Sequence, residues 1–184
     1  MTVEHRRSNP QKPERVVVVG ARGFVGSDLC ARLDTDGVEV VPLSSTDVDL
    51  SRPDSVDQLK AQIRPSDVVV LVAALTPDKG KDIATLMRNL AMGAHFCAAL
   101  GEGACSHVVY ISSDAVYADD ANPVREDSCC HPSGYHGLMH LTRETMLQET
   151  CAAAGIPLFI LRPSLLYGAR DTHNGYGPNR FMRL

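Results

Sequence analysis

The chain has 184 residues, of which 44% are hydrophobic, and this is enough for one globular domain with a sizeable buried core. Its net charge is −4, and its 18 Lys and Arg residues are scattered rather than clustered, which argues against nucleic acid as a partner. The longest apolar runs are far too short to span a bilayer, and the N-terminus lacks the apolar centre of a signal peptide. We therefore expect a cytoplasmic protein without a membrane segment.

The first 14 residues are polar, and we expect them to form a disordered arm. The predicted elements then follow in chain order: a strand at 15–20, a helix at 24–34, a strand at 38–43, a helix at 53–63, a strand at 67–75, a helix at 81–100, a strand at 107–113, a helix at 135–154 and a strand at 157–163. This alternation predicts an α/β fold with a doubly wound parallel sheet of the Rossmann type, in which ligands bind beyond the carboxyl ends of the strands.

The six cysteines show no paired spacing of the kind that binds a metal ion, and we expect no metal site. Cys129 and Cys130 are too close in sequence for an ordinary structural loop. The cysteines are therefore predicted to be reduced thiols that mostly pack in the core.

A glycine-rich turn joins the first strand to the first helix. Gly20, Gly23 and Gly26 have the G-x-x-G-x-x-G spacing, and the helix opens directly at Phe24 and Val25. Glycines in this context allow a tight turn, a close approach to a pyrophosphate, and tight packing of a helix whose N-terminus faces the anion. We therefore expect these five residues to bind a dinucleotide cofactor.

The end of the second strand bears on the choice between NAD and NADP. An Asp or Glu there would bind the ribose 2′-hydroxyl of NAD, but this chain has Ser44 and Ser45. Arg22 of the glycine turn could pair with a 2′-phosphate, with the two serines as further donors. NADP is therefore slightly favoured over NAD. The alternative is that Arg22 is a solvated residue at a loop tip.

Beyond the glycine turn, the chain resembles the extended short-chain dehydrogenase/reductase family, whose members mostly epimerise, dehydrate or reduce nucleotide-linked sugars. The segments that carry the resemblance are GARGFVG, TDVDLSRPDSV, LVAALT, RNLAMGAHFCAAL, VVYISSDAVYAD and LRPSLLYGARD. They occur in the family's order and cover nearly the whole chain after the arm.

The resemblance implies a set of site residues. Ser113 would bind the substrate oxygen and Tyr135 would act as the general acid/base. The substrate would be a nucleotide sugar, and relatives often dimerise through the helix that carries Tyr135 and the long helix before it, so a homodimer is one possible assembly. The further residues implied to contact the cofactor are Asp49, Leu50, Ala73, Ala74, Leu75, Asn89, Ser112 and Pro163.

Met139 departs from the family pattern, because the residue four positions after the tyrosine is normally a lysine. Residues i and i+4 share one face of a helix, so Met139 would lie beside Tyr135, where it can neither bind the nicotinamide ribose nor stabilise a phenolate. Oxidation should suffer more than reduction, since a protonated tyrosine can still donate its proton. His136 and His140 are predicted to point away from this face and to be surface or packing residues. A lysine or histidine from elsewhere, such as His173, would be an alternative replacement.

Three functions remain open. We favour a carbonyl reductase over an epimerase or dehydratase, because Met139 weakens the oxidative step and because Ala115 replaces the Glu that follows the corresponding Asp in some of the dehydratases. Leu165 stands where many relatives carry an Asn that contacts substrate. The third possibility is a dinucleotide-binding module without catalysis. Residues 15–168 are predicted to form the Rossmann domain, and residues 169–184 the start of a truncated substrate-binding region.

Overall fold

The computed structural model of the protein describes residues 11–120, 122–171 and 181. Five parallel strands form one sheet in the order β2-β1-β3-β4-β5. In chain order the elements are β1 (Arg15–Val19), α1 (Phe24–Thr35), β2 (Glu39–Leu43), α2 (Ser55–Lys60), β3 (Val68–Leu71), α3 (Ile83–Ala99), β4 (His107–Ile111), the 3-10 helix η1 (Asp114–Val116), α4 (Tyr135–Ala153) and β5 (Leu158–Leu161). The predicted fold class is confirmed, and each predicted strand and helix is present.

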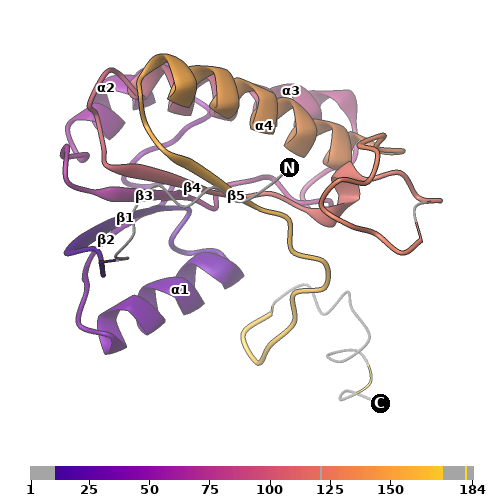
Figure 1. The fold of residues 1–184 in the computed structure, drawn as a ribbon, viewed down its shortest axis with the longest axis horizontal. Coiled ribbons are helices and arrows are strands. Elements are labelled where there is room, and N and C mark those ends of the chain that lie inside the picture. The colour runs from indigo at the N-terminus through magenta and orange to yellow at the C-terminus, as the bar shows by residue number, and fades with distance from the viewer. Residues whose placement is uncertain (1–10, 121, 172–180, 182–184) are drawn as a thin grey trace.

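Helices cover both faces of the sheet. α1 lies on one face, and α2, α3 and α4 lie on the other (Figure 1). β1 shows why the sequence folds in this way: Val16 and Val18 pack toward α1, whereas Val17 and Val19 belong to the larger core on the opposite face. A strand that is buried on both faces needs a continuous run of apolar residues, which is what residues 16–19 provide.

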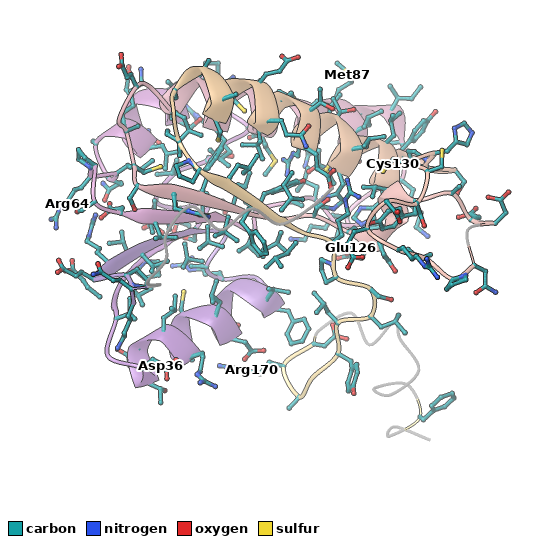
Figure 2. The ribbon with its side chains drawn as sticks, viewed as in Figure 1. Asp36, Arg64, Met87, Glu126, Cys130 and Arg170 are labelled. Carbon is teal, nitrogen blue, oxygen red and sulfur yellow. The ribbon has the colours of Figure 1, made fainter. Side chains whose placement is uncertain are left out.

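The strands end in line at one edge of the sheet. Val19 of β1 is in register with Leu43 of β2 and Leu71 of β3. The glycine turn and the segment between η1 and α4 therefore lie at the same edge. Figure 2 shows Glu126 and Cys130 of that segment at this edge and Arg64 at the opposite edge. We refer to the side with the glycine turn as the carboxyl edge.

Some elements are shorter than predicted. β3 ends at Leu71 rather than at residue 75, because the chain turns away there and the amides of Val72 and Ala73 both donate to the carbonyl oxygen of Val19, each at 2.9 Å. This turn directs the segment after β3 across the end of β1. The residues beyond Leu71 are therefore free of the sheet and can line a site.

The two ends of the chain are described only in part. Residues 1–10 of the predicted arm, most of the predicted substrate-binding region and His173 lie outside the described residues. Two residues of the predicted arm do contact the fold: Lys12 donates to the carbonyl oxygen of Asp36, and the carbonyl of Glu14 accepts from the amide of Glu39 at 3.0 Å.

The structure also bears on cysteine chemistry and membrane spans. All six cysteines are free thiols, as predicted, and Cys105 and Cys151 are buried. In the described parts of the chain, no helix is long and apolar enough to cross a membrane. No group of three or more potential metal ligands occurs in those parts either.

Candidate cofactor and substrate site

The glycine turn at the end of β1 has no room for a side chain at Gly20 or at Gly26. Gly20 has a φ of +102°, and a Cβ atom there would lie 2.6 Å from the backbone nitrogen of Ala73. A Cβ on Gly26 would lie 2.2 Å from the carbonyl oxygen of Gly20. Gly23 is the N-cap of α1, and no side chain among the described residues caps the opening amides of that helix. The backbone amides of Phe24 and Val25 therefore stay available for an anion. The turn thus fits the pyrophosphate of a dinucleotide.

Arg22 of this turn faces the loop that follows β2. Asp47 in that loop accepts hydrogen bonds from the hydroxyl of Ser44 at 2.6 Å and from its amide at 2.9 Å, and these bonds lower the pKa of Asp47. The positive charge of Arg22 lowers this pKa further, so the two side chains are within electrostatic reach. Ser44 is buried and its hydroxyl donates a hydrogen bond to Asp47, whereas Ser45 is exposed. Asp47 was not predicted as a neighbour of Arg22.

The segment after β3 is fixed by a side chain from α3. The amide group of Asn89 accepts from the backbone N–H of Leu75 and donates to its carbonyl oxygen, both at 2.9 Å. Arg143 of α4 lies behind this pair and donates to the carbonyl oxygens of Asn89 and Ala73. It is only 1% exposed. Ala74 lies between the two fixed residues, so the predicted segment 73–75 is held rigidly at the carboxyl edge.

The ends of β4 and β5 are joined through α4. Ser112 donates its hydroxyl to Glu144 at 2.5 Å, and Glu144 also accepts two bonds from Arg162, at 3.0 and 2.6 Å. Ser112 is buried, and its hydroxyl is bonded to Glu144. Ser113 is half-buried, and its Oγ accepts from the amide of Ala115 at 3.2 Å.

The remaining predicted contacts are placed around the same edge. The carbonyl of Pro163 accepts from the amide of Asp114 at 3.1 Å, which ties the end of β5 to η1. Asp49 accepts from the amide and hydroxyl of Ser51, and these bonds lower its pKa. Leu50 is 3% exposed, so its side chain belongs to the core.

A pocket of about 610 Å³ opens between the segment after β3, the start of α3 and the start of α4. Of the predicted site residues, it is lined by Leu75, Asn89, Tyr135 and Met139. Residues that were not predicted also line it: Pro77, Gly80, Lys81, Asp82, Thr85, Leu86, Ser133, Gly134 and His136. The loop before α3 had no recognisable motif, so no sequence signal pointed to Lys81.

The start of α4 differs from the prediction in one respect. His136 was expected to point away from the face shared with Met139 and to be a surface or packing residue; its ring packs against His140, but it also lines the same pocket as Tyr135 and Met139. His140 is a packing residue, as expected: it is 4% exposed, and its Nδ1 lies 2.7 Å from the phenolic oxygen of Tyr110. The place of His136 in the pocket was not predicted, because the prediction considered only the face shared with Met139.

The fold and this edge define a dinucleotide-binding α/β domain of the Rossmann class. The comparisons with known proteins go further. Residues 16–184 match the model of the NAD dependent epimerase/dehydratase family. The chain therefore belongs to that family.

The chain is similar in sequence to two curated relatives. The chain is 30% identical over 159 residues to the spore coat polysaccharide biosynthesis protein SpsK of Bacillus subtilis (84% of this chain, 54% of the relative). It is 29% identical over 177 residues to dTDP-4-dehydrorhamnose reductase of Mycolicibacterium smegmatis (91% and 51%). The chain thus spans about half the length of these curated relatives.

Among solved structures, RMD from Pseudomonas aeruginosa was determined in complex with NADPH. It is 28% identical to this chain with a TM-score of 0.74, and the match covers 88% of this chain and 58% of RMD.

Proposed function

We propose that the protein is an NADPH-dependent reductase that reduces the carbonyl group of a nucleotide-activated sugar. The observation that carries the proposal is the glycine turn, in which Gly20 and Gly26 leave no room for side chains at the opening of α1. Support comes from family membership, from a relative named as a dTDP-4-dehydrorhamnose reductase, and from RMD, which binds NADPH. A cytoplasmic location and a homodimer are part of the same proposal.

When bound, NADPH would supply the hydride, and the chain would supply binding, orientation and the proton. The opening amides of α1 would hold the pyrophosphate, and Arg22 would pair with the 2′-phosphate. Ser113 would donate its hydroxyl to the carbonyl oxygen and stabilise the charge that develops there. The family resemblance nominates Tyr135 as the proton donor; it lines the pocket at the start of α4.

Cofactor binding tests this proposal directly. Isothermal titration calorimetry should show that the protein binds NADPH more tightly than NADH. Because a charge-assisted bond contributes about 1.5–3 kcal/mol, Arg22→Ala should weaken NADPH binding by about 10- to 100-fold and leave NADH binding nearly unchanged. Arg32→Ala is the matched control, since Arg32 is exposed in the last turn of α1 and pairs with Asp36. If neither dinucleotide binds, the proposal is wrong.

A second candidate is a dinucleotide-binding module without catalysis, and the observation that favours it is Met139. This side chain lines the pocket and is only 1% exposed, so a thioether occupies the position where the family has a lysine. NADPH binding without hydride transfer to any 4-keto nucleotide sugar would support the module. Transfer of deuterium from labelled NADPH to such a sugar would exclude it.

The other alternative is an epimerase or dehydratase. These reactions begin with an oxidation that needs a base, whereas reduction needs an acid. Turnover of a sugar nucleotide without net consumption of NADPH would favour this alternative over the reductase.

A further inference from the structure

Two histidines on α4 form a pair that runs from the pocket into the core. The rings of His136 and His140 meet edge to face, with centroids 4.7 Å apart and an angle of 88° between the ring planes. His140 is held in turn by the phenol of Tyr110, which is 1% exposed. The imidazole at the pocket is therefore backed by a rigid, buried partner.

The helical repeat places His136 on the inner face of α4. His136, His140, Arg143 and Leu147 recur at the i, i+4, i+7, i+11 spacing that marks one stripe of a helix. The last three are 4%, 1% and 1% exposed, so this stripe faces the sheet. Tyr135 is rotated by about 100° from it and is 45% exposed. Both residues line the pocket, but of the two only the histidine lies on the stripe that faces the sheet.

The first turn of α4, which carries His136, packs against the element that follows the serine expected to bind the substrate. A Cβ on Gly137 would lie 1.9 Å from the carbonyl oxygen of Ala115, so the first turn of α4 packs directly on η1. The carboxylate of Asp114 acts electrostatically on His136, and Asp114 follows Ser113 in the chain. The start of α4, where His136 lines the pocket, therefore packs against η1, whose N-cap is Ser113.

We propose that His136 donates the proton to the substrate carbonyl, in the role that the family resemblance gives to Tyr135, with His140 and Tyr110 as positioning residues. The inference rests on the proposed reductase and changes only its proton donor. In the reaction, the carbonyl carbon accepts a hydride from NADPH and its π electron pair moves to the oxygen. The imidazolium of His136 transfers its N–H proton to that oxygen. The products are the alcohol, NADP⁺ and a neutral imidazole, which regains a proton from solvent.

The charges around His136 favour proton donation by its imidazolium. Burial lowers its pKa, and the negative charge of Asp114 acts in the opposite direction, so the imidazolium is an acid that gives up its proton readily. Burial also lowers the pKa of His140, to about 2, so this neighbour stays neutral and adds no second positive charge. Across the pocket, the charged residues of the opposite wall are Lys81 and Asp82.

The same arrangement accounts for Met139. Residues three apart on a helix are neighbours, so a lysine at position 139 would place a permanent positive charge beside the imidazolium of His136. That charge would disfavour the protonated form of the acid. An apolar side chain at position 139 therefore avoids lowering the pKa of His136 further than burial already does, whereas a tyrosine donor would gain from a lysine.

The test compares His136→Gln with Tyr135→Phe and Met139→Lys in the reduction of dTDP-4-dehydrorhamnose by NADPH. We expect His136→Gln to lower kcat by about 10²- to 10⁴-fold, the usual contribution of a positioned acid, with NADPH affinity unchanged. Tyr135→Phe should lower kcat by much less than His136→Gln does, and Met139→Lys should lose activity. In the wild type, kcat/KM should fall as pH rises through the pKa of His136, and His140→Phe should move this profile.

A second measurement does not depend on turnover. The Cε1–H resonance of His136, assigned by its loss in His136→Gln, should titrate at lower pH with NADP⁺ bound than with NADPH bound, because a cationic nicotinamide ring nearby disfavours the imidazolium. If the wild type binds NADPH but the resonance does not respond, or if His136→Gln reduces the probe at the wild-type rate, the inference is wrong and the reductase stands. If NADPH does not bind at all, both are wrong.

Discussion

At the scale of single residues, His140 should make the stability of the protein depend on pH. Its ring is buried against Tyr110, His136 and Arg143, and burial, followed by repulsion from His136 and Arg143, lowers its pKa from 6.5 to about 2. The unfolded chain therefore binds a proton below pH 6.5 that the folded chain does not bind. The stability linked to His140 is fully present above pH 6.5 and is lost as the pH falls from there toward about 2.

The variant His140→Gln isolates this effect. Below pH 6.5 the wild type should lose about 1.4 kcal/mol of unfolding free energy per pH unit more than the variant, because one proton is linked to unfolding. Urea unfolding at a series of pH values measures both slopes, and the titration of carboxylates common to both proteins cancels in the difference. His131→Gln is the control, since His131 is exposed and should leave the slope as in the wild type. Equal slopes for wild type and His140→Gln would contradict the prediction.

At the scale of elements, one buried ion pair joins α4 to the end of β5. Glu144 is 2% exposed and accepts from Arg162 and Ser112, so it connects the helix to two strand ends at once. Arg162 also donates to the phenol of Tyr117 at 2.9 Å. This junction fixes the rotation of α4 relative to the sheet, and with it the face that His136 and His140 present.

Removing one partner of this pair should be costly. Glu144→Gln leaves the Arg162 guanidinium without a counter-charge and should lower the free energy of unfolding by about 3–5 kcal/mol in denaturant titrations. The double variant Glu144→Gln/Arg162→Met should cost clearly less than the sum of the two single changes, because the two residues are coupled. Glu149→Gln, an exposed change on the same helix, should have no measurable effect. If the loss of unfolding free energy in the double variant equals the sum of the losses in the two single variants, Glu144 and Arg162 do not act as a unit.

The elements themselves could be predicted from sequence because their signals are local. The run of valines at residues 16–19 and the glycine turn specify a strand, a turn and a helix without help from the rest of the chain. The rotation of α4 could not be predicted in this way. Its inner stripe includes His136, His140 and Arg143, so a search for apolar periodicity misses it. These polar residues can lie inside only because Tyr110 and the Asn89 carbonyl, both far away in sequence, are their partners.

The neighbours of Arg22 also could not be predicted from local sequence patterns. The sequence showed an arginine in the turn and serines after the second strand, and the structure brings Arg22 within electrostatic reach of Asp47. That contact depends on how the loop after β2 closes. The hydroxyl of Ser44 bonds to both Asp47 and Thr46 there. Such closure is a tertiary property, which no spacing rule encodes.

At the scale of the whole molecule, the two faces of the sheet are covered unequally. α2, α3 and α4 extend across one face, but on the other face α1 packs mainly against β1 and β2. On that second face, Phe159 and Leu161 of β5 are 38% and 41% exposed. Leu158 and Ile160, which alternate with them, pack against the core on the covered face. The described residues thus leave an apolar strip along β5 in contact with solvent.

This strip should bind a hydrophobic dye, and its removal should not weaken the fold. We expect the double variant Phe159→Thr/Leu161→Thr to bind less of the dye 8-anilinonaphthalene-1-sulfonate than the wild type, because exposed apolar patches are its binding sites. Threonine keeps the preference of the strand for extended backbone, so the free energy of unfolding should change by less than about 1 kcal/mol. Ile160→Thr is the matched control: it removes a core contact, so it should lower stability more and leave dye binding as in the wild type. If the double variant destabilises the protein as much as Ile160→Thr does and binds dye as strongly as the wild type, this face of β5 is covered in solution.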